Sequence, residues 1–140
     1  MLPRPLRKYV CEYAYVDGNQ VRLGPACARL PTDEVRAIIA HEHGHIALGH
    51  ARERRRHLWR NLHHLWWLSR GRWDKLRAWI DMAWQHEFDA DVWAFRAGYG
   101  DAMIRFLRRR SDVGDIWHPP IAFRVARLLQ LQWEKDHGER

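Results

Sequence analysis

The sequence predicts one α+β domain, predominantly α-helical, with a small N-terminal β-hairpin. Its 140 residues support one hydrophobic core rather than two, so we expect a single domain over residues 1–140. β-branched and aromatic residues are concentrated before the turn signal Asp17-Gly18-Asn19. From Thr32 onward, apolar residues recur at helical spacing in successive segments.

The N-terminal region predicts the hairpin. Tyr9 to Val16 form the expected first strand, and Gln20 to Leu23 form the return strand. Cys11 and Cys27 lie at similar distances from the turn, so a disulfide between them and a pair of reduced thiols both remain open. We favour the reduced pair, in which each cysteine serves as a small hydrophobic residue.

The remaining sequence predicts five helices. Their expected ranges are Thr32 to about Arg52, Arg56 to Ser69, Asp74 to Arg96, Asp101 to Arg109, and Ile121 to about Glu134. Asp33 and Glu34 suit the first turn of the first helix, where backbone N–H groups attract negative charge. Gly71 ends the second expected helix and Gly98 the third. His118-Pro119-Pro120 marks a loop before the last helix.

The positive charge of the chain is concentrated in one segment. The chain carries 24 basic and 17 acidic residues, a formal net charge of +7. Between Arg52 and Arg77 there are nine basic and two acidic residues, so the remaining sequence is neutral. We interpret residues 52–77 as a basic, Trp-rich helical insertion. Three roles stay open: a solvated helical hairpin packed on the domain, an interfacial helix on an anionic membrane, and a surface for nucleic acid or a protein partner.

Several classes of protein are disfavoured by composition. No segment approaches twenty uninterrupted apolar residues, so we expect no transmembrane helix. Met1 to Lys8 are not followed by the apolar run of a signal peptide. Two cysteines are too few for a disulfide scaffold. We therefore expect a soluble, cytoplasmic protein, with peripheral membrane association through the basic segment left open.

The residues that indicate chemistry begin with an HExxH motif in the first expected helix, His41-Glu42-His43-Gly44-His45. Because His41 and His45 are four residues apart, their imidazoles share one helix face and can bind one zinc ion. Glu42 is rotated about 100° from His41, beside the open coordination position, where it can act as general base. Gly44 lets another segment pack close to this turn.

A catalytic zinc ion needs a third protein ligand. Ala51 stands where metzincins have histidine, so the better candidate is Glu87, on the third expected helix. Asp91 follows it by four residues and can accept a hydrogen bond from a ligand histidine. His118 can donate a hydrogen bond to a developing oxyanion. Surface or core packing is the expected role of the other nearby histidines: His43, His50 and His86.

With these motifs, the chain resembles the zinc metallopeptidase family of the membrane heat-shock protease HtpX and the CAAX prenyl protease. The family pattern is a short hairpin, an HExxH helix often followed by Gly-His, an ExxxD helix, and a His-Pro-Pro loop with an arginine. The matching segments are His41–His45, Gly49–His50, Glu87–Asp91 and His118–Arg124. The resemblance covers roughly Tyr13 to Leu128.

The resemblance implies a zincin-like fold and a gluzincin-type zinc peptidase that cleaves polypeptides. The residue roles that it implies are: zinc ligands His41, His45 and Glu87; general base Glu42; a supporting Asp91; oxyanion stabilisation by His118; and support of the site by Arg124. Without membrane-spanning helices, the chain is most similar to the small soluble forms called minigluzincins. That similarity suggests a latent enzyme, in which a terminal segment fills the cleft.

Two alternatives to this function remain. Regulatory proteases of the ImmA/IrrE type also combine HExxH with a downstream glutamate. A zinc-stabilised binding module that docks on anionic membrane or nucleic acid through Arg52–Arg77 belongs to a different class. Under the peptidase hypothesis, we expect the strand Gln20–Leu23 to line the cleft and pair with an extended substrate.

Overall fold

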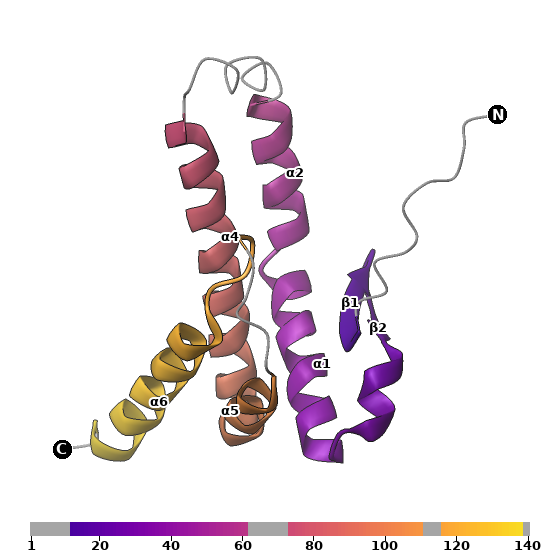
Figure 1. Ribbon diagram of the computed structural model, residues 1–140, viewed down its shortest axis with the longest axis vertical. Helices are drawn as coiled ribbons and strands as arrows, with labels where there is room; N and C mark the ends of the chain where they lie inside the picture. The colour runs from indigo at the N-terminus through magenta and orange to yellow at the C-terminus, as the bar shows by residue number, and fades with distance from the viewer. Residues whose placement is uncertain (1–11, 62–72, 111–115, 139–140) are drawn as a thin grey trace.

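The computed structural model describes residues 12–61, 73–110 and 116–138. In this part of the chain, helices predominate beside one two-stranded antiparallel sheet, which confirms the α+β, mainly α, class (Figure 1). The elements in chain order are β1 (Ala14–Asp17), β2 (Gln20–Leu23), the 3-10 helix η1 (Pro25–Arg29), α1 (Thr32–Ala47), α2 (His50–Asn61), α4 (Trp73–Ala94), the π-helical η3 (Phe95–Tyr99), α5 (Gly100–Arg109) and α6 (Ile121–His137).

The hairpin closes through a tight turn between β1 and β2. Asp17 pairs with Gln20, which leaves Gly18 and Asn19 as the two turn residues. Gly18 has a φ of 64°, in the left-handed region that such turns require. The predicted return strand is confirmed. The first strand begins at Ala14, later than predicted, and residues 1–11 lie outside the described part.

Of the two cysteines, the structure describes only Cys27. Cys27 is buried and carries a free thiol, which donates to the carbonyl oxygen of Tyr13 at 2.9 Å. Burial raises the pKa of this thiol, so it remains protonated and unreactive. Cys11 lies outside the described residues.

The first predicted helix divides into α1 and α2, so its expected continuation to Arg52 is wrong. Gly49 has a φ of 69°, which takes the backbone out of the right-handed helix, and its N–H donates to the carbonyl oxygen of Ile46. The helical path resumes at His50. This interruption turns His50 back toward the end of α1.

Helices α1 and α4 pack very closely because small residues line their contact. A Cβ atom at Gly44 would lie 2.9 Å from Cβ of Trp93 and 3.1 Å from Cα of Ala90. Ala90 and Ala94 are completely buried. Gly44 therefore permits the close approach that the sequence predicted for it, and the HExxH turn lies directly against α4.

The later helices complete the core. Met103 and Leu107 of α5 and Leu128 of α6 are at most 1% exposed. The third, fourth and fifth predicted helices are confirmed, with α6 extending to His137. Gly98, the predicted end of the third helix, marks a kink with a φ of 91° between α4 and α5. At the start of α1, the buried Glu34 accepts a hydrogen bond from Arg109 at 3.0 Å.

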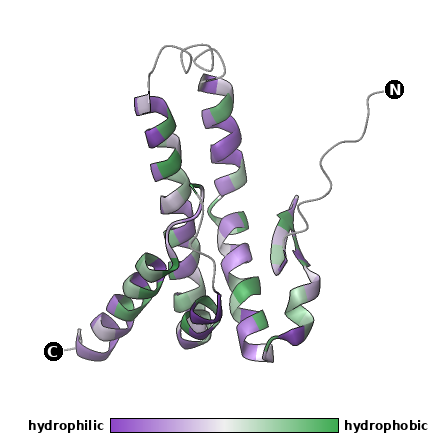
Figure 2. Ribbon diagram, in the orientation of Figure 1, coloured by the Kyte–Doolittle hydropathy of each residue, from purple (hydrophilic) through white to green (hydrophobic). Residues whose placement is uncertain are grey.

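The basic, Trp-rich segment is helical where it is described. Helix α2 runs beside the first part of α4, and Figure 2 shows α2 as mostly hydrophilic. Trp59 and Trp73 are each 68% exposed, so neither indole packs on the domain as the helical-hairpin interpretation expected. Residues 62–72, which include the other aromatic residues of the predicted second helix, lie outside the described part. No described helix has the length and apolar character needed to cross a membrane.

Candidate metal centre

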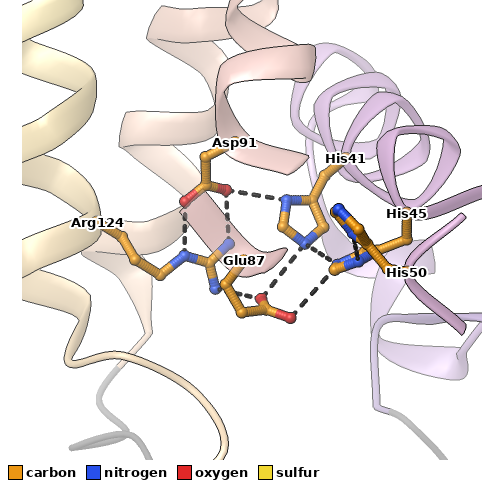
Figure 3. Close-up of polar contacts among 6 residues, drawn as sticks. All are labelled: His41, His45, His50, Glu87, Asp91 and Arg124. Atoms are coloured by element: carbon orange, nitrogen blue, oxygen red, sulfur yellow. Dashed lines mark hydrogen bonds and ion pairs between the residues drawn. The ribbon is translucent and has the colours of Figure 1, made fainter. Parts of the chain in front are cut away.

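Two histidines of α1 and a glutamate of α4 converge on one point (Figure 3). The Nε2 atoms of His41 and His45 are 3.2 Å apart. Glu87 lies against both, with Oε2 3.5 Å from His41 Nε2 and Oε1 3.3 Å from His45 Nε2. The three residues are only 7–8% exposed. This buried group can hold a metal ion.

The spacing of these atoms fits a tetrahedral cation. Metal–ligand bonds of about 2.0–2.1 Å at tetrahedral angles place ligand atoms about 3.3–3.4 Å apart. The observed separations of 3.2, 3.3 and 3.5 Å are close to that value. Two imidazoles and one carboxylate also form the donor set of many catalytic zinc sites. The spacing and the donor types of these side chains therefore suit a tetrahedral divalent cation.

Asp91 and Arg124 hold the metal-ligand residues in orientation. Asp91 Oδ1 lies 2.9 Å from His41 Nδ1, the ring nitrogen on the far side from the cluster. Arg124 donates two hydrogen bonds to Asp91, from Nε to Oδ2 at 2.7 Å and from Nη2 to Oδ1 at 2.6 Å. Its Nη1 reaches Glu87 Oε2 at 3.3 Å. One guanidinium therefore orients both a ligand carboxylate and the carboxylate that aligns His41.

Charge pairing determines the protonation of this cluster. Burial lowers the pKa of His41, but Asp91 and Glu87 outweigh it and raise that pKa to about 9. Burial raises the pKa of Glu87, but hydrogen bonds from His41 and His45 bring it well below its usual range. The pKa of Asp91 is likewise lowered, because Arg124 outweighs the effect of burial. At neutral pH the metal-free cluster holds two carboxylates and one imidazolium, so a binding cation must displace the His41 proton.

His50 supports the second ligand, a role that the sequence analysis did not assign to it. His45 Nδ1 and His50 Nδ1 are 2.8 Å apart, and His50 is 2% exposed. His50 stacks on His86, with ring centroids 4.1 Å apart and an interplanar angle of 11°. His86 Nε2 in turn donates to Glu53 at 2.9 Å. Helices α2 and α4 together hold the His50 ring against His45.

The direction of the His45–His50 hydrogen bond follows from the chemistry of the cluster. Burial, reinforced by the nearby His86 and His45, lowers the pKa of His50 to about 3, so its ring is neutral. Burial also lowers the pKa of His45. When His45 offers the lone pair of Nε2 to a cation, its proton is on Nδ1 and is donated to His50 Nδ1. Gly49 is the sequence signal for this contact, since it interrupts the helix just before His50.

A cleft of about 860 Å³ opens onto the metal-ligand group. Glu42 and His118 both line it, as do His41, His45 and Glu87. The structure therefore brings the predicted general base and the predicted oxyanion donor to the same cavity as the ligands. His43 is exposed, as predicted, and is not among the lining residues.

The strand that lines the cleft is β1, not β2 as predicted. Ala14, Tyr15 and Val16 belong to the lining, whereas no residue of β2 does. The two strands differ in position, because β1 packs more extensively against α1 than β2 does. Tyr15 and Asp17 are hydrogen-bonded to β2, so the N–H and C=O groups of Ala14 and Val16 point to the edge away from β2. In Figure 1 the hairpin lies beside α1, on the side away from α4.

Comparisons of the chain with protein-family models, with curated proteins and with solved structures found no match in any of the three. The resemblance to the HtpX and CAAX prenyl protease family, and the zincin-like fold that it implies, therefore stay predictions. The predicted latency also stays a prediction, since residues 1–11 lie outside the described part. Among the described residues of α6, Arg124 alone lines the cleft.

Proposed function

We propose that this chain is a zinc metalloendopeptidase of the gluzincin type. The observation that carries the proposal is three buried ligands, His41, His45 and Glu87, at the floor of an open cleft. In the described part of the chain, no fourth histidine, cysteine or carboxylate joins them. Structural zinc sites are closed by four protein ligands, whereas catalytic sites have three and leave one position for water or substrate. The arrangement favours catalysis over a structural role.

The chain's own groups supply the proton transfers. A bound zinc ion would act as a Lewis acid toward the scissile carbonyl and the attacking water. Glu42, on the cleft wall one residue after His41, accepts the proton of the attacking water and passes it to the leaving amine. His118 donates a hydrogen bond to the oxyanion that develops on the carbonyl oxygen. Asp91 and Arg124 hold His41 and Glu87 in orientation throughout.

An extended polypeptide fits the open edge of β1. The main-chain groups of Ala14 and Val16 face that edge, and a substrate strand can form alternating hydrogen bonds with them. Such pairing aligns the peptide backbone without regard to side chains. It also brings the peptide into the cavity that holds Glu42 and the metal ligands.

The test combines metal analysis with cleavage of a peptide library. The wild-type chain should bind one zinc ion and cleave peptides. Glu42→Gln should retain the zinc and lose about 10²–10⁴-fold in kcat, the usual contribution of a general base. Glu87→Ala should lose both zinc and activity. A wild-type chain that binds zinc stoichiometrically but cleaves no peptide would refute the proposal.

The second candidate is a zinc-stabilised binding module. It is favoured by the exposed arginines of α2 together with Trp59 and Trp73, which suit an anionic surface. This candidate predicts salt-sensitive retention on anionic vesicles or nucleic acid with no cleavage. A regulatory protease of the ImmA/IrrE type would use the same three ligands and differ in its substrate.

A further inference from the structure

Three arginines of α2 line the cleft. Arg52, Arg54 and Arg55 belong to the same cavity as His41 and Glu42, and all three side chains are exposed. They follow directly from the Gly49 turn, which brings the start of α2 to the metal-ligand group. The three positive charges therefore lie in the same cavity as the metal-ligand group.

Two further carboxylates, Glu12 and Glu42, line the same cavity, and neither forms an ion pair with these arginines. Glu53 stands between them in the sequence, but its carboxylate turns toward α4, where His86 donates to it at 2.9 Å. Glu87 is engaged by His41, His45 and Arg124. No ion pair joins a described acidic side chain to Arg52, Arg54 or Arg55.

We propose that the cleft selects polypeptides with Asp or Glu side chains placed against Arg52, Arg54 and Arg55. This inference rests on the proposed peptidase function and adds a substrate class to it. Guanidinium groups bind carboxylates through paired hydrogen bonds, which are stronger than neutral ones and directional. A substrate extended along β1 passes through the same cavity, so its side chains come within reach of α2. Because the arginines share this cavity with a strand edge, an acidic peptide suits it better than a nucleic acid.

The experiment compares charge variants on one helix. The test variant is Arg54→Gln/Arg55→Gln, which removes two charges from the cleft. The matched control is Arg56→Gln/Arg60→Gln, which removes two charges from the same helix at exposed positions that do not line the cleft. Fluorogenic peptides of one sequence carry Glu, Gln or Lys at successive positions on each side of the scissile bond.

We expect the Glu peptides to be cleaved with a kcat/KM about tenfold above the Gln peptides, and the Lys peptides to be cleaved most slowly. The test variant should lose this preference while it still binds one zinc ion per chain. The control variant should keep the preference. Raising the salt concentration should weaken it, because the arginines are exposed. Equal kcat/KM for Glu and Gln peptides would overturn the inference and leave the peptidase function standing.

A binding measurement separates this inference from the peptidase function. In the zinc-loaded Glu42→Gln background, labelled Glu and Gln peptides are titrated and followed by fluorescence anisotropy. Tighter binding of the Glu peptide, lost in the test variant, supports the acidic-substrate inference even where the wild type cleaves nothing. A single-stranded oligonucleotide is the competitor. If it binds more tightly than the Glu peptide and the test and control variants weaken it equally, the arginines serve a nucleic-acid surface and the inference is wrong.

Discussion

Removal of the acceptor on His50 should weaken metal binding through His45. In the metal-bound state, His45 must hold its proton on Nδ1, 2.8 Å from Nδ1 of His50, which accepts it and is itself only 2% exposed. In His50→Leu this buried donor has no acceptor. In the metal-free state His45 can hold its proton on Nε2 instead, so the cost falls on the metal-bound state and appears in the affinity.

The size of the effect follows from two estimates that agree. A buried donor without a partner costs about 1–3 kcal/mol. Loss of a group that orients a ligand histidine typically lowers metal affinity about 10- to 100-fold, which is about 1.4–2.8 kcal/mol. We expect His50→Leu to lie in this range. His50→Gln should recover part of the affinity, because its amide oxygen can accept the same proton.

The assay is competition with a chromophoric zinc chelator, with circular dichroism to check folding. His43→Ala is the matched control, since His43 is an exposed histidine of the same motif and should leave the affinity unchanged. In addition, ¹⁵N NMR of zinc-loaded protein should report a proton on His45 Nδ1. An unchanged affinity in His50→Leu, or equal losses in the Leu and Gln variants, would refute the positioning role.

Three further predictions concern the packing and charge around the ligands. Gly44→Ala should lower the free energy of unfolding by about 1–3 kcal/mol and weaken zinc binding, because the new methyl group would meet Trp93 and move α4, with Glu87, away from α1. Chemical denaturation measures the stability and chelator competition the zinc affinity. Values equal to those of the wild type in both assays would contradict this prediction. The metal-free protein should lose stability as pH rises from about 6.5 toward 9, because the raised His41 pKa of about 9 stabilises the folded state only while that ring is protonated. Urea denaturation across this range measures the loss, and Asp91→Asn should flatten it, so a slope equal to that of the wild type would argue against the pairing. Arg124→Gln should lower zinc affinity about 10- to 100-fold, since both carboxylates that it orients lose their charge partner; calorimetric titration with zinc would count against this role if the affinity were unchanged.

Local signals in the sequence were sufficient for most elements. The hairpin turn at Gly18 was predictable because few residues other than glycine tolerate its positive φ. The helices α1, α4, α5 and α6 followed from apolar periodicity, and the ligand pair His41/His45 from a spacing that matches one helical turn. The second predicted helix, Arg56 to Ser69, lies mostly outside the described residues, and α2 begins earlier, at His50. The break at Gly49 was missed because the apolar pattern continues across it, and a single glycine inside such a pattern does not by itself end a helix.

The sequence by itself determined the residue types of the candidate site and the faces of the helices on which they stand. Both follow from the 3.6-residue period, which is a local property of the backbone. Only the tertiary structure decided which distant groups meet: Glu87 with the two histidines, Arg124 with Asp91, and β1 rather than β2 at the cleft. It also placed His50 against His45. These contacts depend on how closely α1 and α4 pack and on how far the chain turns at Gly49, and neither is contained in the periodicity of one segment.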